Sequence, residues 1–288
     1  MQETGQTTAL ARHYLDIERP ERALDALDRP GATDPADPEH WYLRGQALYD
    51  LERYAEASRT VQAGLVQEPE SVPLLFLRCN CEARLGNLAA AEQAILTALR
   101  LLPEEPALLC RYALLVARVG QLDKAARLID EATRIDAEDP AVARARVTLA
   151  YLRGNDRQVT QASKELLASD PEDTFGHYML GHALFSRGSV GDAHRHLRTA
   201  AQLDPSEQVV VEGAREARFA DHWLLWPLRP FQRFGSIGLW FGFIVLFFLL
   251  RSLGMRPLAG LVALLYLILV IYSWVVPWLL RKWLSWRS

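Results

Sequence analysis

The chain has few of the residues that build disulfide frameworks, metal centres or catalytic motifs. It contains only three cysteines, Cys79, Cys81 and Cys110, and their spacing fits neither a disulfide framework nor a zinc site. We interpret all three as small core or groove residues in a reducing compartment. We find no glycine-rich phosphate loop, no G-x-S-x-G, no H-E-x-x-H and no pair of carboxylates on a shared rigid element. The sequence therefore predicts a protein that is not an enzyme and that holds no cofactor.

The histidines also lack a metal-ligand pattern. Four of them lie close together in the sequence, at His177, His182, His194 and His196. His177 and His182 are five residues apart, whereas chelation from one helix needs a spacing of four. His194 and His196 are two apart and face different ways on a helix. We predict no metal site and a solvated or packed role for each.

Acidic residues are absent from the C-terminal part of the chain. The formal net charge is −3, but all 35 aspartates and glutamates precede Trp223. From Trp223 onward there are seven basic residues and seven of the eight tryptophans. The acidic part argues against a nucleic-acid partner, because its surface would repel phosphates. The first ten residues lack the basic start and apolar run of a secretory signal, so we expect this part to stay in the cytoplasm.

The sequence repeats with a period of 34 residues. Five units follow one another without insertion, at 38–71, 72–105, 106–139, 140–173 and 174–207. The eighth, twentieth and twenty-seventh columns hold mostly small residues, such as Gly45, Ala57 and Gly64 in the first unit. Small residues in these columns let two helices approach closely, which predicts a stack of paired helices.

Two further columns mark where the predicted helices end. The fifteenth column holds Glu52 and then glycine, at Gly86, Gly120, Gly154 and Gly188. The first helix of each unit must end and turn there. The thirty-second column holds proline in four units, at Pro69, Pro103, Pro171 and Pro205, and proline stops the second helix.

These columns resemble the tetratricopeptide repeat (TPR) family over about residues 4–207. The unit at 38–71 matches the pattern best, through Trp41, Gly45, Tyr54, Ala57 and Pro69. The resemblance implies an all-α fold, a TPR right-handed helical solenoid. The fourth unit departs most from the pattern, at Asp156, Val159, Ser163 and Leu166.

Each end of the repeat array carries an atypical segment. Residues 1–37 are expected to form an N-terminal capping repeat and a loop, with Pro20 opening the second helix. Residues 208–222 are interpreted as a solvating helix over the last repeat, as is common at the end of TPR arrays.

The resemblance implies that the array binds partners through its concave face, which the first helix of each pair lines. Helical spacing places these residues on that face: Tyr42, Gln46, Tyr49, Phe76, Asn80, Arg84, Leu114, Arg118, Arg144, Tyr151, Tyr178, His182 and Phe185. Cys110 and Thr148 share the face. The mixture of arginine and aromatic residues suits an extended or helical peptide with acidic residues, because arginine binds carboxylates through paired hydrogen bonds. The alternative is that half of these residues merely pack between adjacent units.

Two uncharged runs follow the repeats. Residues 223–233 combine tryptophan, arginine and proline, which suits a membrane–water interface. As helices, the runs at 234–250 and 257–280 would measure about 25 Å and about 36 Å, against a hydrocarbon core of about 30 Å. We predict two transmembrane helices that form a hairpin, followed by a basic aromatic tail at 281–288. The alternative is a buried helix pair in a soluble oligomer.

The distribution of basic residues predicts the orientation of this hairpin. The side that holds both ends carries Arg215, Arg218, Arg229, Arg233, Arg281, Lys282 and Arg287, whereas the connecting loop carries only Arg251 and Arg256. Positive charge stays inside, so both termini are predicted to be cytoplasmic. The predicted location is the inner membrane of a bacterium.

Small residues recur at helical spacing within the two runs. Gly235, Gly238 and Gly242 share one face of the first, and Ala259 and Ala263 repeat the spacing in the second. Such faces allow close helix packing, whether against the other arm, a second copy or a foreign membrane protein. No ionisable residue interrupts either run, so nothing indicates an ion path.

The sequence therefore predicts a membrane-anchored TPR scaffold or adaptor that binds a protein or peptide, and that also contacts membrane lipid. A second possibility is a non-catalytic subunit of a membrane-embedded assembly, in secretion, pilus or envelope machinery, that contacts partners through its hairpin. A third is enzyme regulation or an unrecognised activity.

Overall fold

The computed structural model describes residues 2–29, 38–221, 224 and 229–285. Side chains are described at 7–29, 39–220, 224, 241–258, 260–273, 275 and 276. These residues form helices and no strand, in agreement with the predicted all-α class. The chain divides into two compact units, 1–153 and 154–288, and each is described by itself.

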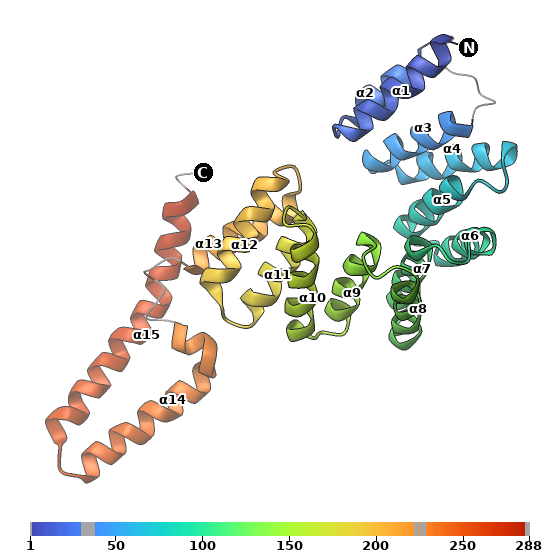
Figure 1. Ribbon diagram of the computed structural model, residues 1–288. Coiled ribbons are helices and arrows are strands. Elements are labelled where there is room, and N and C mark those ends of the chain that lie inside the picture. The colour runs from blue at the N-terminus through green and yellow to red at the C-terminus, as the bar shows by residue number, and fades with distance from the viewer. Residues whose placement is uncertain (1, 30–37, 222–223, 225–228, 286–288) are drawn as a thin grey trace. The chain divides into compact units, whose positions relative to one another are not determined.

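The described part of the first unit consists of nine helices (Figure 1). Their bounds are α1 (Gln2–Asp16), α2 (Pro20–Leu27), α3 (Pro38–Asp50), α4 (Tyr54–Gln67), α5 (Val72–Leu85), α6 (Leu88–Leu101), α7 (Pro106–Arg118), α8 (Leu122–Ile135) and α9 (Pro140–Leu152). Helices α1 and α2, α3 and α4, α5 and α6, and α7 and α8 form pairs, and each pair packs on the next helix. Proline is the first residue of α2, α3, α7 and α9, where its missing N–H needs no partner.

The turns within the helix pairs have the left-handed backbone that the fifteenth column predicts. Gly86 and Gly120 have φ of 83° and 84°, and Glu52 adopts the same conformation with φ of 59°. The Arg53 amide then donates to the Leu48 carbonyl at 2.9 Å, which closes the end of α3. Glu18, one period before Glu52, has φ of 55°, so the N-terminal unit keeps the register of the repeats.

The small-residue columns lie where helices approach closely. A Cβ added at Gly45 would stand 2.7 Å from Val61 Cγ2, and one added at Gly64 would stand 2.6 Å from Trp41 Cβ. Ala57, in the remaining small column of this unit, is fully buried. These columns therefore set the spacing of the helices, because a larger side chain would push them apart.

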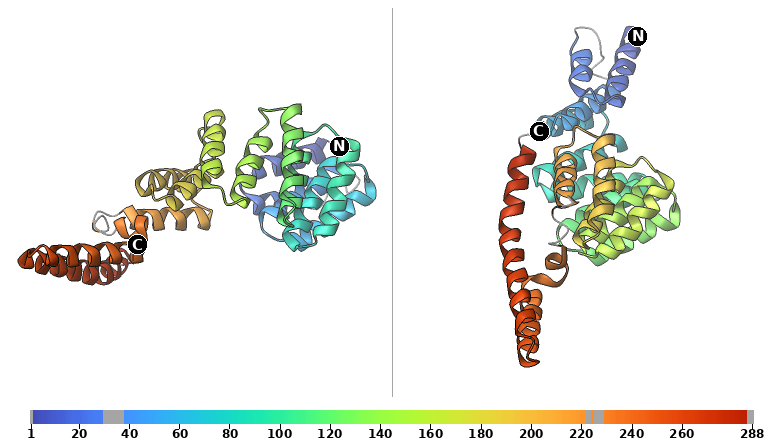
Figure 2. Two further views of the ribbon diagram at one scale, coloured as in Figure 1. Left: turned by 90° about the horizontal axis from the view of Figure 1, so that it is seen from below. Right: turned by 90° about the vertical axis from the view of Figure 1, so that its left-hand side faces the viewer.

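The described part of the second unit contains α10 (Asp156–Ser169), α11 (Thr174–Ser186), α12 (Val190–Leu203), α13 (Gln208–Asp221), α14 (Arg229–Ser252) and α15 (Arg256–Ser285). Helices α10 to α13 pack one after another, and α13 also touches α11. Val210 and Ala217 of α13 are buried. Helices α14 and α15 lie side by side in every view (Figures 1 and 2).

The boundary between the two units falls inside the fourth predicted repeat, between α9 and α10. Helix α10 carries the departures from the repeat pattern. Val159, Ser163 and Leu166 are buried, and the Ser163 hydroxyl has no hydrogen-bond partner among the described residues. A buried hydroxyl without a partner carries a desolvation cost, which an alanine at this position would avoid.

Of the two predicted transmembrane helices, the described residues support one. Helix α15 contains an 18-residue stretch, Arg256–Ser273, that is long and apolar enough to cross a membrane. The described apolar part of α14 is shorter, at Phe241–Ser252. The side chains of the rest of the first predicted run lie outside the described residues, as do those of Gly235, Gly238 and Ala259, the 223–233 linker except Leu224, and the tail at 281–288.

Aromatic side chains make the described contact between α14 and α15. The Phe243 and Tyr266 rings are 4.8 Å apart, and a hollow of about 230 Å³ beside them is lined in part by Phe247 and Ala263. An added Cβ at Gly242 would meet no atom within 4 Å. Gly242 therefore makes no close contact with the other arm of the hairpin among the described residues, and the partner of the small-residue face stays a prediction.

Candidate functional site

The predicted groove residues of the first unit divide into half-buried and exposed side chains. Half-buried are Tyr42, Gln46, Tyr49, Phe76, Asn80, Leu114 and Thr148, and exposed are Arg84, Arg118, Arg144 and Tyr151. Cys110 is buried at 2% exposure and does not contribute to the surface. The surface thus has apolar and amide groups at its base and arginine at its edge.

Tyr49, Tyr54 and Arg84 form one cluster across α3, α4 and α5. The Tyr49 and Tyr54 rings meet edge to face with centroids 5.3 Å apart. The Arg84 guanidinium lies over the Tyr54 ring, 4.8 Å from its centroid, and donates to the Tyr54 hydroxyl. Stacking holds the guanidinium in place and leaves other N–H groups for a ligand.

Arg111 of α7 adds a second guanidinium beside Tyr49. Burial raises the pKa of the Tyr49 hydroxyl, and the positive charges of Arg111 and Arg84 oppose this rise. Arg111 is half-buried, and its Nε is fully buried with no hydrogen-bond partner among the described residues. Such a buried donor is costly. The charge of Arg111 and a hydrogen bond from it also oppose the rise that burial causes in the pKa of the Cys79 thiol, so the guanidinium has one contact within the chain. The sequence analysis missed Arg111 because helical spacing alone places it at the margin of the face.

None of these arginines is neutralised by a carboxylate in the part of the chain that the structure describes. Arg84, Arg111 and Arg118 take part in none of the ion pairs between described residues. Arg118 donates instead to the Ala83 carbonyl at 2.9 Å, which ties α7 to the end of α5. Arg118 therefore has a structural contact in addition to its predicted role.

The α3 end of the same surface has the opposite charge. The Gln46 amide donates to Asp50 Oδ1 at 2.7 Å. Burial raises the pKa of the Asp50 carboxyl, and the hydrogen bond from Gln46 opposes that rise. Burial also raises the pKa of Tyr42, and the charge of Asp50 adds to this effect. A ligand would therefore meet a carboxylate at α3 and two guanidinium groups at α5 and α7.

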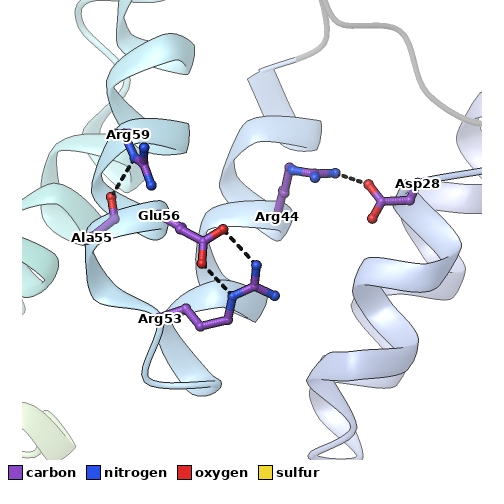
Figure 3. A network of polar contacts seen from close by, with 6 residues as sticks. All are labelled: Asp28, Arg44, Arg53, Ala55, Glu56 and Arg59. Carbon is purple, nitrogen blue, oxygen red and sulfur yellow. Dashed lines mark hydrogen bonds and ion pairs between the residues drawn. The ribbon is translucent and has the colours of Figure 1, made fainter.

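A separate network of polar contacts lies at the N-terminal helix pair and the first full repeat, and within it the Arg44–Asp28 pair joins the two (Figure 3). Arg44 of α3 pairs with Asp28 after α2, and Arg53 binds Glu56 through two hydrogen bonds of 2.8 and 2.7 Å. These arginines face carboxylates of the chain itself. We therefore assign this network a structural role.

The predicted groove residues of the second unit lie in a different environment. Tyr178, His182 and Phe185 of α11 line a cavity of about 250 Å³, and α13 forms its other wall. Two carboxylates of α13, Glu212 and Glu216, also line this cavity. The sequence analysis did not anticipate that α13 would bring acidic groups to this face.

The described histidines and cysteines form no metal cluster of three or more ligands together with acidic residues. His177 and His196, nineteen residues apart, approach with their Nδ1 atoms 3.0 Å apart, and His177 Nε2 lies 3.0 Å from the Pro171 carbonyl. All three cysteines are buried. Burial raises the pKa of Cys81 and of Cys110 to about 12, so neither thiol forms a reactive thiolate at neutral pH.

Comparison with known proteins identifies the repeats. The tetratricopeptide repeat family model matches residues 8–72, 42–106 and 82–140, and the chain therefore contains tetratricopeptide repeats. No curated protein matches the chain.

Two solved structures illustrate the likeness in fold. One is a thermophilic TPR protein of Thermus thermophilus, with 18% identity and a TM-score of 0.57 over 63% of this chain and 99% of that chain. The other is the human IFIT1 dimer with m7Gppp-AAAA, with 17% identity and a TM-score of 0.56 over 72% of this chain. This match spans 54% of the IFIT1 chain. Identities this low show the fold alone, which is a TPR helical solenoid.

Proposed function

We propose that this chain is a non-catalytic, membrane-tethered adaptor whose first unit binds a carboxylate-bearing segment of a partner protein. The observation that carries the proposal is that the positive charges of Arg84 and Arg111 both act on Tyr49. Neither guanidinium pairs with a carboxylate among the described residues, and Arg111 Nε is buried without an acceptor. A bound carboxylate would supply the charged acceptor that neither guanidinium has among the described residues.

The charge pattern of the surface also predicts which types of ligand residue lie at each end of it. Asp50 lies at the α3 end and repels an acidic group, whereas Arg84 and Arg111 attract one. Tyr42 and Phe76, half-buried on the predicted groove face, offer apolar area. The preferred ligand therefore carries an aromatic or aliphatic residue next to an aspartate or glutamate, and a basic or neutral residue toward α3.

The second part of the proposal is the membrane tether. In α15, none of the described side chains in the stretch Arg256–Ser273 is buried. Leu261, Leu264, Leu265, Leu267, Ile268 and Ile271 are each more than half exposed. An apolar helix face of this extent is unfavourable in water and favourable in lipid. We propose an inner-membrane location with the TPR units in the cytoplasm, on the basis of the arginine distribution.

A peptide array tests the binding proposal with the full-length chain in a mild detergent. The array carries fifteen-residue peptides that differ in their acidic, basic and aromatic content. We expect retention of peptides that combine carboxylates with an apolar anchor. The variant Arg84→Gln should lose them, and Arg111→Lys should weaken them, because lysine keeps the charge without the planar fork. Binding of basic peptides, or unchanged binding by Arg84→Gln, would contradict the proposal.

The matched control is Arg127→Gln combined with Arg134→Gln. Both arginines are exposed on α8 and outside the proposed surface, and the double variant removes more charge than Arg84→Gln. It should bind as the unmodified chain does.

Carbonate washing tests the membrane tether. Washing of membranes from expressing cells should leave the chain in the pellet, and release of the chain into the supernatant would refute the tether.

The second candidate function is a subunit of a membrane assembly that makes its specific contact through the hairpin. It is favoured by the open space around Gly242. Under this alternative, Gly242→Leu should abolish co-purification of membrane partners while Arg84→Gln has no effect.

A further inference from the structure

A basic cavity lies between α12 and α13, outside the surface described above. Its volume is about 480 Å³, within the range of small-ligand sites. His194 and Arg198 of α12 and Arg215 and Arg218 of α13 line it, together with Gln202 and small apolar residues. No aspartate or glutamate is among the lining residues.

The charges of α13 are separated between two sides. Glu212 and Glu216 line the cavity beside α11, whereas Arg215 and Arg218 line the basic cavity beside α12. Arg198, Arg215 and Arg218 make no ion pair with a described carboxylate. This distinguishes them from Arg44 and Arg53, which are paired with carboxylates (Figure 3). Three unneutralised arginines around one hollow favour an anion with several oxygen acceptors.

The position of this cavity relates it to the end of the apolar stretch of α15. Phe219, which directly follows Arg218, belongs to the same apolar cluster as Leu269, Tyr272 and Val276 of α15. The Tyr272 hydroxyl donates to the Leu224 carbonyl at 2.5 Å. The uncharged run that holds these α15 residues continues to Leu280, and Arg281 and Lys282 follow it. If the run at 257–280 spans the hydrocarbon layer, the C-terminal end of α13 packs on the last turns of that run, next to the headgroups on the side of Arg281 and Lys282.

We propose that the α12–α13 cavity binds the phosphate of an anionic lipid headgroup through Arg198, Arg215 and Arg218. This proposal rests on the proposed membrane tether. Basic pockets next to membrane-spanning helices on the cytoplasmic side are suited to anionic headgroups. A nucleic acid is a poorer fit, because its single-stranded form needs aromatic platforms for base stacking and the cavity wall has no tyrosine, tryptophan or phenylalanine. The site holds the end of the TPR array against the membrane surface and fixes its orientation.

Native mass spectrometry of the full-length chain, released from detergent, tests the site. The probe is dioctanoyl phosphatidylglycerol, and dioctanoyl phosphatidylcholine, inorganic phosphate and a short oligoadenylate serve as comparisons. We expect one phosphatidylglycerol to bind per chain. The variant Arg198→Gln/Arg215→Gln/Arg218→Gln should bind it about a hundredfold more weakly, from the typical contribution of each arginine near an anionic surface.

The control variant is Arg127→Gln/Arg134→Gln/Arg157→Gln. It removes the same total charge from exposed arginines that do not line the cavity, and its affinity should be unchanged. Equal binding of phosphatidylcholine, equally tight binding of inorganic phosphate, a preference for oligoadenylate, or unchanged affinity in the cavity variant would each overturn the proposal.

Carbonate washing of the same variants separates this proposal from the tether. A chain that stays in the membrane pellet but does not distinguish the two lipids refutes the cavity assignment and leaves the tether intact. A chain that carbonate releases refutes the tether, and the headgroup proposal fails with it.

Discussion

Replacement of Gly64 by alanine should loosen the first repeat, although alanine is the better helix former. Gly64 lies within α4, where a Cβ would stand 2.6 Å from Trp41 Cβ, 2.9 Å from Leu74 Cδ1 and 3.0 Å from Trp41 Cγ. Trp41 Cβ is attached directly to the backbone of α3, so a change of rotamer cannot move it away. The two helices must separate to admit the methyl group.

The expected loss is the difference between two effects. Alanine favours a helix over glycine by about 1 kcal/mol. Overpacking of a rigid contact costs about 1–3 kcal/mol, and the upper part of this range applies because the obstacle is a backbone-proximal atom. We therefore expect Gly64→Ala to destabilise the α3–α5 region by about 1–2 kcal/mol.

Gly213→Ala in α13 is the matched control with the opposite expected sign. The nearest atoms to its added Cβ are Leu197 Cδ2 and Tyr178 Cε2, both at 3.5 Å, which is ordinary van der Waals contact. Only the helix-propensity gain remains, so this variant should be more stable by about 0.5–1 kcal/mol.

Hydrogen exchange of the full-length chain measures both effects locally, which matters because repeat arrays do not unfold as one unit. Exchange in α3–α5 should rise about tenfold in Gly64→Ala, since 1.4 kcal/mol corresponds to a factor of ten. Exchange in α12–α13 should fall in Gly213→Ala. Unchanged or slower exchange around Gly64 in its variant would refute the packing argument.

Three further predictions concern single groups. Cys81 and Cys110 should resist iodoacetamide at pH 8 until the chain is denatured, because burial raises the pKa of both thiols to about 12; rapid labelling of the folded chain would contradict their burial. Burial lowers the pKa of His196, and the charge of His177 lowers it further. The stability that the fold gains from neutral His196 is therefore complete above the ordinary histidine pKa of about 6.5, and it is lost as the pH falls through the lowered value. The protection of the α11–α12 amides, taken relative to the intrinsic exchange rate at each pH, should therefore fall as the pH is lowered from 7.5 to 5, and should fall less in His196→Gln. Protection that does not depend on pH in the unmodified chain would be inconsistent with this. Glu52→Gly should stabilise the α3–α4 turn by about 0.5–1 kcal/mol, because glycine relieves about 1–2 kcal/mol of left-handed strain at φ of 59° but loses more entropy on folding. Faster exchange at the α3–α4 turn amides in that variant would argue against strain at Glu52.

The sequence by itself determined the helices, their ends and the spacing between them in the repeats. The turn after α3 illustrates why. A hydrogen bond from the Arg53 amide to the Leu48 carbonyl joins residues five apart, so a short stretch of sequence is enough to predict it. The contact at Gly64 can also be predicted from the sequence, because a column of small residues that repeats every 34 residues indicates that two helices approach closely there.

Only the tertiary structure decided which side chains meet across helices. Arg111 lies beside Tyr49, sixty-two residues earlier, and α13 brings Glu212 and Glu216 against the face of α11. Gly242, whose spacing suggested a packing face, has open space around it. These results depend on how each helix is rotated against its neighbours. That rotation results from the summed packing of many side chains, and no local pattern in the sequence records it.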